Sequence, residues 1–335
     1  MRSAPLDPGR LPPALRAALG PLAALYGFGV GVRNLLYDRG WIRARRLPVP
    51  TISVGNLSTG GTGKTPMVAA LARKIRARGK RPGILARGYG AAGGPNEETL
   101  ELGLSLPEVP LVEDPDRLRG GRTLLERGVD VAILDDGFQH RRLARDLDVV
   151  LLDATRPFDR DRLLPAGLLR EPPRGLARAG LLVLTRADQA APEEKDRLWS
   201  ALRRIRAGVP RVEARHAPVG VLEAASGRVL PPEALRGLEV FLLSAIGNPR
   251  AFAKTAVLLG ARTRGEFVFR DHHSFTARDL AAVAAACGTT PVLATGKDWP
   301  KLRGRLRPPC LVLQIEVEFT AGEEAVEEAL DSLLR

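Results

Sequence analysis

A glycine-rich segment, NLSTGGTGKTP at residues 56–66, has the residue types and spacing that bind nucleotide phosphates. In a P-loop, successive backbone N–H groups point at phosphate oxygens, a lysine neutralises their charge and a hydroxyl holds magnesium. Lys64 supplies the cation and Thr65 the hydroxyl, whereas the first glycine of the general pattern G-x-x-x-x-G-K-[ST] is Ser58. The residues expected to contact the nucleotide are Ser58, Thr59, Gly60, Gly61, Thr62, Gly63, Lys64 and Thr65.

Two aspartates supply the acidic half of such a site. The apolar run VAILDD at 131–136 ends in Asp135 and Asp136, and open α/β sheets bind their ligands at the carboxyl ends of the strands. Together with Thr65, these carboxylates predict a site for Mg2+. Strand-end aspartates can instead cap a helix, but the P-loop favours the metal site.

Strands and helices in alternation must position these residues. The apolar run VPTISV at 49–54 precedes the loop, and apolar residues recur at helical spacing from 65 to 78 after it. Similar apolar runs at 83–86, 149–154 and 181–185 alternate with helical stretches. The sequence therefore predicts an α/β fold, with a P-loop NTPase-like parallel sheet covered by helices on both faces.

A second, smaller α/β domain is expected further along the chain. It begins where residues 211–227 alternate between apolar and polar types without a helical pattern. Its expected strands are 239–245, 266–269 and 291–295, and its expected helices follow Asn248-Pro249 and span 276–287. The expected domains are 1–212 with the P-loop, 213–320 with β-linker segments, and a C-terminal helix at 321–335 that returns to the first domain.

The formal net charge of +13 predicts an anionic partner. Nucleic acid is not expected, because the chain shows neither a zinc finger nor an aromatic stacking pattern. Cys287 and Cys310 are the only cysteines, and their spacing offers neither a disulfide framework nor a metal site. This composition is typical of a cytosolic chain, and no obligate protein partner is predicted.

The N-terminal segment differs from the rest of the chain. Residues 17–32 carry no charge, and residues 1–50 hold eight arginines against two aspartates, a net charge of +6. This apolar run is shorter than the roughly 20 residues that cross a bilayer as a helix and contains Pro21, so we expect an interfacial helix at about 14–36. The alternative is a helix that only packs on the P-loop domain.

Longer motifs carry a family resemblance. SVGNLSTGGTGKTP, ILARGYG, DDGFQHRRLARDLDVVLLDA and RLLPAGLLREP occur in this order. The chain thereby resembles the tetraacyldisaccharide 4′-kinase family of lipid A biosynthesis, from about residue 20 to 320. The resemblance implies ATP- and Mg2+-dependent phosphorylation of the 4′-hydroxyl of tetraacyldisaccharide 1-phosphate, a lipid substrate, at the anionic surface of the cytoplasmic face of the inner membrane.

The resemblance also implies a catalytic base. In the family, a carboxylate after the third strand pairs with a histidine from the second domain, and Lys64 is the catalytic cation. The segments VEDPDRLRGG and FRDHHSF suggest Asp116 and His272, with Asp114 and His273 as the open alternatives.

Further residues are assigned by the same resemblance. Gln139 and His140 are implied to contact the substrate, Arg170 fits the 1-phosphate, and Tyr89 belongs to the nucleotide region. Lys297 is given no catalytic role, because Gly296 replaces the glutamate of the family's usual Thr-Glu-Lys-Asp run. LTRAD at 184–188 weakly resembles a guanine-binding motif, and we interpret it as a strand end followed by a helix cap.

Two other functions compete with the lipid kinase. A P-loop nucleotide switch or metallochaperone-type NTPase would carry a lysine where this chain has Thr59, or a His/Cys cluster, and it has neither. A kinase of a soluble sugar or nucleoside would leave the apolar N-terminal segment with a packing role only.

Overall fold

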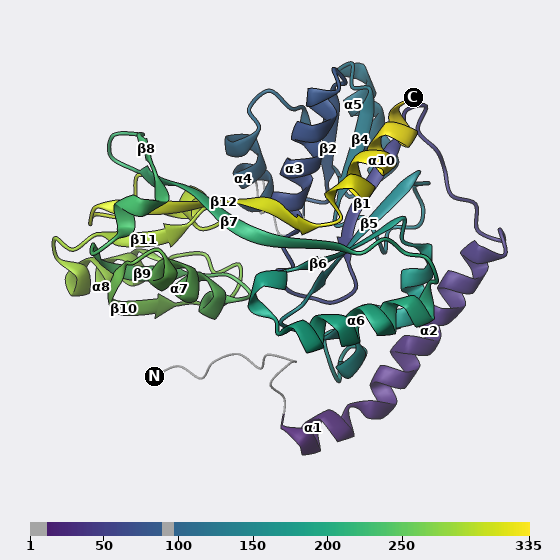
Figure 1. Cartoon of the computed structure of the whole chain (residues 1–335), viewed down its shortest axis with the longest axis horizontal. Helices are drawn as coiled ribbons and strands as arrows, with labels where there is room; N and C mark the ends of the chain where they lie inside the picture. The colour runs from purple at the N-terminus through teal and green to yellow at the C-terminus, as the bar shows by residue number, and fades with distance from the viewer. Residues whose placement is uncertain (1–11, 89–96) are drawn as a thin grey trace. The chain divides into compact units, whose positions relative to one another are not determined.

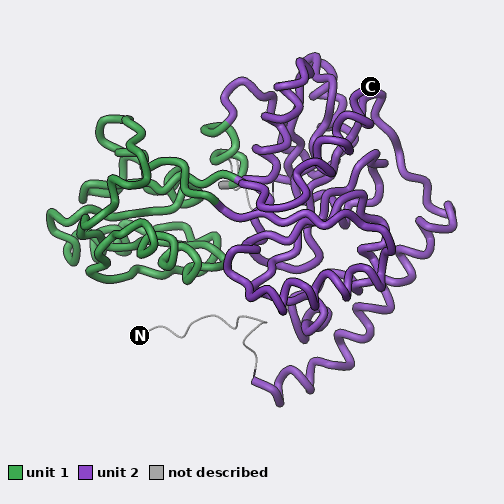
Figure 2. The backbone as a smooth tube through the Cα atoms, viewed as in Figure 1, with its two compact units in different colours: residues 1–4, 94–105, 217–316 green, residues 5–93, 106–216, 317–335 purple. Residues whose placement is uncertain are grey.

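The computed structural model describes residues 12–88 and 97–335, which form two compact units (Figures 1 and 2). Of these residues, unit 2 contains 12–88, 106–216 and 317–335, and unit 1 contains 97–105 and 217–316. Two long strands, β7 (Val212–Glu223) and β12 (Cys310–Ala321), run from one unit into the other. The P-loop lies in unit 2 and the candidate histidines lie in unit 1.

A parallel sheet forms the centre of unit 2, with strand order β7-β6-β5-β1-β4-β2-β3. Every residue of β1, β2, β4 and β6 is buried, as expected for strands covered on both faces. In chain order, the first six strands are β1 (Thr51–Asn56), β2 (Pro82–Ala86), β3 (Leu111–Glu113), β4 (Val131–Asp135), β5 (Leu147–Asp153) and β6 (Leu181–Thr185).

Helices cover this sheet on opposite sides, as Figure 1 shows for α3 and α6. α3 contacts β1, β2 and β4, and Trp199 of α6 lies in an apolar cluster with Val150 and Leu182 of β5 and β6. The C-terminal helix α10 is bound to α3 through Lys74 and Glu327. The helices of unit 2 beyond the N-terminal segment are α3 (Lys64–Ala77), α5 (Arg117–Glu126), α6 (Pro192–Ile205), α10 (Glu323–Leu334) and the short 3-10 turns Phe158–Arg160, Pro173–Arg178 and Ala187–Gln189.

The N-terminal segment forms α1 (Pro13–Ala18) and α2 (Gly20–Asp38). One side of α2 is bound to unit 2, where the Tyr26 hydroxyl donates to the Arg170 carbonyl at 2.7 Å. Its other side exposes apolar side chains, including Leu25 at 68% and Phe28 at 71%. Within the described ranges, no helix combines the length and apolar character needed to cross a bilayer.

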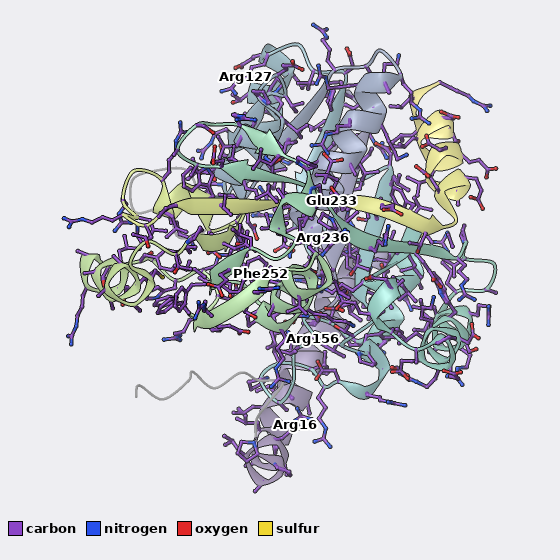
Figure 3. The ribbon with its side chains drawn as sticks, turned by 60° about the vertical axis from the view of Figure 1, so that its left-hand side comes forward. Arg16, Arg127, Arg156, Glu233, Arg236 and Phe252 are labelled. Atoms are coloured by element: carbon purple, nitrogen blue, oxygen red, sulfur yellow. The ribbon has the colours of Figure 1, made fainter. Side chains whose placement is uncertain are left out.

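The strand order in unit 1 is β10-β9-β11-β12-β7. The pairs β10–β9, β9–β11 and β11–β12 are parallel, and β8 pairs antiparallel with β7. Its apolar core includes Leu243, Phe275 and Val283, and Phe252 on α7, labelled in Figure 3, lies in a second cluster. Its elements are α4 (Glu97–Ser105), β8 (Val229–Leu230), the 3-10 turn Pro232–Leu235, β9 (Glu239–Ser244), α7 (Pro249–Leu258), β10 (Arg262–Val268), α8 (Ala277–Cys287), β11 (Val292–Thr295) and α9 (Trp299–Leu302).

The predicted α/β class with a parallel, P-loop NTPase-like sheet is confirmed. One expected boundary differs from the structure. Residues 97–105, placed in the first domain from sequence, form α4, which packs against α9 of unit 1. The sequence contained no signal that α4 belongs to unit 1, because this assignment depends on a contact between α4 and α9, which lie about 200 residues apart in the chain.

Candidate active site

The phosphate loop has the expected position between β1 and α3. Gly63 has a left-handed backbone (φ 89°) directly before α3 begins at Lys64. A Cβ at Gly63 would also collide with the imidazole of His216, so both the backbone and the space require glycine. The buried Asn56 at the end of β1 donates to the Thr62 hydroxyl at 3.0 Å and to the Gly60 carbonyl at 3.3 Å. The loop is therefore held from within by the strand that precedes it.

Neighbouring segments hold the same loop from outside. The backbone N–H of Thr59 donates to the Leu168 carbonyl at 2.8 Å, and Ser58 pairs with Leu169 in an isolated bridge. Ser58, which replaces the first glycine of the general pattern, therefore contacts the RLLPAGLLREP motif. Arg156, labelled in Figure 3, brings Nη1 to 3.5 Å from the position a Cβ on Gly60 would take. This arginine is a cation beside the loop that sequence reasoning missed.

Lys64, Asp136 and Arg170 form a charged cluster at the mouth of the loop. Lys64 Nζ lies 3.7 Å from Asp136 Oδ1, and Arg170 Nη1 lies 2.8 Å from both Asp136 carboxylate oxygens. Burial raises the pKa of Asp136, but Lys64 and Arg170 outweigh it, so this pKa is below its usual range. Asp136 is therefore a carboxylate at neutral pH, placed against two cations.

The turn after β4 has the backbone needed to place Asp136. This residue has a left-handed φ of 54°, and the next N–H, of Gly137, donates to the Val54 carbonyl at 3.1 Å. Gly55 permits this close approach, because a Cβ there would lie 2.8 Å from the backbone nitrogen of Phe138. Left-handed residues other than glycine are costly and concentrate at functional sites.

The donor set fits magnesium. β1 and β4 are paired so that Asp135 lies opposite Val54, two residues before the end of β1, and Lys64 faces Asp136. The hydroxyl of Thr65 and the carboxylates of Asp135 and Asp136 are hard oxygen donors, the type that Mg2+ prefers. No group of three or more His, Cys, Asp or Glu side chains arranged for a metal occurs in the described part of the chain.

Arg117 supports the strand end that carries these aspartates. It is buried, and Nη2 donates to the Asp135 carbonyl at 3.0 Å. Burial lowers the pKa of Arg117 to about 10, against the opposing effect of Asp135 and Asp136, so it stays charged at neutral pH. Sequence reasoning missed this role of Arg117.

Gln139 and His140 lie on the loop that follows Asp136. Gln139 Nε2 donates to the Asn56 carbonyl at 2.9 Å and to Glu171 at 3.0 Å. Burial, followed by the charge of Arg117, lowers the pKa of His140 to about 4, so its imidazole is neutral at pH 7. Gln139 is thus tied to the end of β1 where the phosphate loop begins, and the substrate role of both residues stays a prediction.

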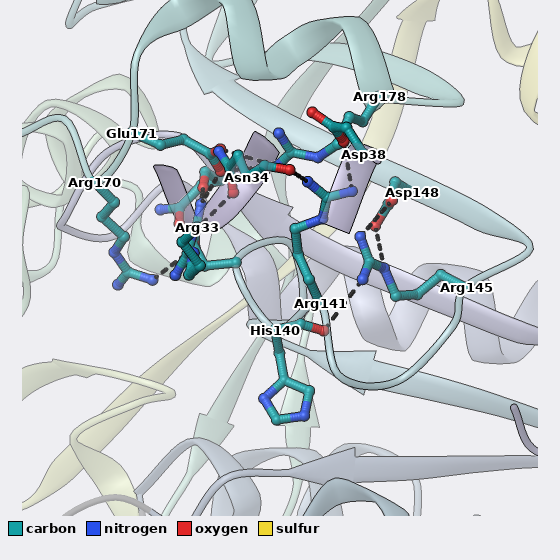
Figure 4. A network of polar contacts seen from close by, with 12 residues as sticks. Arg33, Asn34, Asp38, His140, Arg141, Arg145, Asp148, Arg170, Glu171 and Arg178 are labelled. Atoms are coloured by element: carbon teal, nitrogen blue, oxygen red, sulfur yellow. Dashed lines mark hydrogen bonds and ion pairs between the residues drawn. The ribbon is translucent and has the colours of Figure 1, made fainter. Parts of the chain in front are cut away.

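Glu171 joins this loop to the N-terminal helix. Its side chain is fully buried, accepts from Asn34 of α2 at 3.1 Å and pairs with Arg178 at 2.9 Å (Figure 4). Asp38 of α2 makes a second tie, to Arg141 at 2.7 Å. The segment REP was quoted from sequence, but nothing in the pattern indicated that its glutamate connects α2 to the site.

The two candidate aspartates after β3 have different contacts. Asp116 caps α5, because its carboxylate accepts from the N–H groups of Leu118 at 3.0 Å and Arg119 at 3.4 Å. Asp114 is buried, pairs with Arg119 at 2.6 Å and accepts from the Asp116 N–H. Hydrogen bonding from Arg119 holds the pKa of Asp114 below its usual range. Both carboxylates therefore have structural contacts, and their assignment as a base stays a prediction.

The two candidate histidines of unit 1 also differ. His273 bonds Asp279 at 2.9 Å and stacks on Phe269, inside the capping box of α8. His272 has a left-handed φ of 60°, and 55% of its side chain is exposed. Its Nε2 lies 3.3 Å from Lys297 Nζ. His273 thus packs within unit 1, whereas the His272 side chain is more exposed, and the choice between them as the base stays a prediction.

Lys297 and Tyr89 complete the comparison with the predicted residues. Lys297, given no role from sequence, pairs with Asp271 at 2.8 Å and thereby supports the segment that carries His272. Tyr89 lies outside the described residues.

Known proteins resemble this chain over nearly its whole length. Residues 15–335 match the family described as Tetraacyldisaccharide-1-P 4′-kinase. The tetraacyldisaccharide 4′-kinases of Anaeromyxobacter dehalogenans (strain 2CP-C) and Geobacter sulfurreducens are 42% and 39% identical to it, over 93% and 96% of this chain and 92% and 94% of theirs. The crystal structure of "apo" form LpxK from Aquifex aeolicus in complex with ATP superposes with a TM-score of 0.76 at 32% identity, covering 96% of this chain and 100% of that one.

The resemblance drawn from the sequence motifs is confirmed, and the nucleotide switch or metallochaperone is not favoured. The chain belongs to the tetraacyldisaccharide-1-P 4′-kinase family.

Proposed function

We propose that this chain transfers the γ-phosphoryl group of ATP to the 4′-hydroxyl of tetraacyldisaccharide 1-phosphate, giving the bis-phosphorylated lipid A precursor. The carrying observation is the placement of Lys64 at the start of α3, 3.7 Å from Asp136, beneath a glycine loop whose backbone is held on both sides. Phosphoryl transfer requires mainly positioned cations, and this arrangement provides them. The family membership supports the lipid as acceptor.

Individual residues divide the work. The loop N–H groups and Lys64 bind the β- and γ-phosphates, and Thr65, Asp135 and Asp136 would hold Mg2+. The metal would neutralise charge on the phosphates when bound. Arg170, with its guanidinium at Asp136, provides a further donor for a phosphate of either substrate.

The base remains proposed as Asp116 with His272. Asp116→Asn tests the role of Asp116 as a base without removing the helix cap, because asparagine caps helices as well as aspartate does but cannot accept the proton. A fall in the transfer rate of about 10²-fold with unchanged thermal stability supports the base role. An unchanged rate assigns Asp116 to the cap alone, and Asp114→Asn is the parallel variant.

The main experiment measures transfer of labelled γ-phosphate from MgATP to tetraacyldisaccharide 1-phosphate in detergent micelles. The matched control acceptor is the same lipid with its 4′-position already phosphorylated. Label in the first lipid and not in the second supports the proposal. Magnesium-dependent ATP hydrolysis without labelled lipid contradicts it.

We also propose that the chain works as a peripheral protein at the cytoplasmic face of the inner membrane. The exposed Leu25 and Phe28 of α2 and the basic N-terminal segment support this location. Exchanging Leu25 and Phe28 for aspartate should reduce sedimentation with anionic vesicles. Exchanging Val257 and Leu258, equally apolar and exposed at 56% and 75% on α7, is the matched control. Equal sedimentation of both variants would contradict a role for α2.

A further inference from the structure

A strained residue without an assigned role lies next to the phosphate loop. Within residues 12–88 and 97–335, three residues other than glycine have a left-handed backbone: Asp136, Arg186 and His272. Asp136 and His272 already belong to the candidate site. Arg186 follows β6 in the LTRAD segment, which the sequence analysis treated as a strand end and helix cap. Because such backbone strain concentrates at functional sites, Arg186 requires an explanation.

Arg186 and its neighbour both contact the phosphate loop directly. Arg186 Nη2 donates to the Gly61 carbonyl at 2.7 Å, and the Thr185 hydroxyl donates to the Thr62 carbonyl at 3.0 Å. Both side chains are buried. Two consecutive loop carbonyls are therefore held by two consecutive residues at the end of β6.

These hydrogen bonds orient the loop peptides. In a trans peptide the carbonyl and the following N–H point in opposite directions. Holding the Thr62 carbonyl toward Thr185 therefore turns the Gly63 N–H away from β6. Gly63 is the last residue before α3, where backbone N–H groups bind phosphate. A loop held this way loses less conformational entropy when a polyphosphate binds.

The charged groups around Arg186 also hold it in position to orient the loop. Its guanidinium pairs with the buried Asp153 at the end of β5. His216 packs against Gly63, and burial followed by the charge of Arg186 lowers the pKa of His216 to about 4, so the imidazole is neutral at pH 7. Arg186 is thus fixed by Asp153 on one side while it donates to the loop on the other.

We propose that Thr185 and Arg186 form a clamp that fixes the phosphate loop in the conformation that binds a nucleotide polyphosphate. They are positioning residues for the loop, and they do not select the nucleobase. The proposal rests on the proposed function only in that the loop binds a nucleotide. It requires no phosphorylation of the lipid.

The test measures binding of MgATP to the full chain by calorimetry, without lipid. Thr185→Val keeps the side-chain shape and removes the hydroxyl, and Arg186→Lys keeps the charge and removes the fork. Each should weaken MgATP binding by about 5- to 10-fold, the effect of one lost hydrogen bond to a positioned group. Thr155→Val is the matched control, because it removes a hydroxyl that donates to the same Asp153 at 2.7 Å.

Inorganic tripolyphosphate with Mg2+ separates the clamp from nucleobase recognition. The clamp predicts that Thr185→Val weakens tripolyphosphate and MgATP by the same factor, with the KM for ATP raised more than kcat is lowered in the kinase assay. Weakened MgATP with unchanged tripolyphosphate would assign the segment to the nucleobase and overturn the proposal. Unchanged binding of both probes in both folded variants would also overturn it. Should Arg186→Lys not fold, Thr185→Val decides alone.

Discussion

The two regions that carry candidate catalytic residues are held in different ways. At the phosphate loop of unit 2, the strained Arg186 and its neighbours are buried and donate to backbone carbonyls. In unit 1, the strained His272 is held by a backbone hydrogen bond to Ala245 at 3.2 Å and by a side-chain contact to Lys297. Its imidazole is otherwise largely exposed.

This difference suits the phosphate loop to binding and the His272 segment to movement. Buried hydrogen bonds to the backbone fix a loop that must match several phosphate oxygens at once. Exposed contacts such as Lys297 with Asp271 contribute little free energy and allow a side chain to adjust. Substitutions at the loop should therefore affect binding and stability, whereas substitutions at His272 should affect the rate alone.

Lys64→Met should have the largest effect. Removing the cation that we propose binds the γ-phosphate is expected to lower the rate of labelled phosphate transfer by about 10²- to 10³-fold. The matched control is Lys74→Met on the same helix, whose ammonium pairs with Glu323 and Glu327 of α10. A control variant as inactive as Lys64→Met would mean that the loss reflects the fold and not the chemistry.

His272→Gln should come next, with a transfer rate reduced by about 10²-fold. Because His272 is exposed, the free energy of unfolding should stay within about 0.5 kcal/mol of the unsubstituted chain. His273→Gln should show the reverse, with a loss of about 1–2 kcal/mol from its contacts with Asp279 and Phe269 and a smaller change in rate. Both quantities come from kinase assays and thermal melts, and equal rates for the two variants would remove His272 as the base.

Gly63→Ala should weaken MgATP binding by more than tenfold. Alanine adds left-handed strain of about 1–2 kcal/mol and a collision with His216. Gly79→Ala is the matched control, since Gly79 is also left-handed (φ 72°) but has open space around its Cβ position. Calorimetry of both variants separates the strain, which they share, from the collision. Equal affinities would show that His216 does not restrict the loop.

A pH dependence of stability in unit 2 should be the smallest effect. An unfolded histidine binds its proton near pH 6.5, whereas burial and Arg186 lower the pKa of folded His216 to about 4. The unfolded state therefore binds more protons between these values, and stability falls as pH drops from about 6.5 to about 4. Urea unfolding followed by tryptophan fluorescence should show that the free energy of unfolding falls by at most about 2 kcal/mol between pH 7 and 5 through His216. His216→Gln should reduce that slope, and an unchanged slope would contradict the assignment.

The sequence by itself determined the features that depend on a short local segment. The apolar runs before the P-loop and at VAILDD predicted β1 and β4 because residues buried on both sheet faces must be apolar. Lys64, Asp135 and Asp136 were predicted as site residues because phosphate binding needs a lysine after a glycine-rich loop and magnesium binding needs oxygen ligands at strand ends. The motif order was sufficient to identify the family.

Tertiary structure decided which residues support that site. Arg186, Arg156 and Glu171 act on segments far away in the chain, and no local pattern shows which carbonyl or carboxylate a distant arginine will reach. The LTRAD segment is the predicted strand end followed by a cap, but its sequence did not indicate the contacts of Thr185 and Arg186 with the phosphate loop. Sequence cannot distinguish the neighbours His272 and His273. The structure does, because His272 has a left-handed backbone whereas His273 packs against the rings of Phe269 and Phe275.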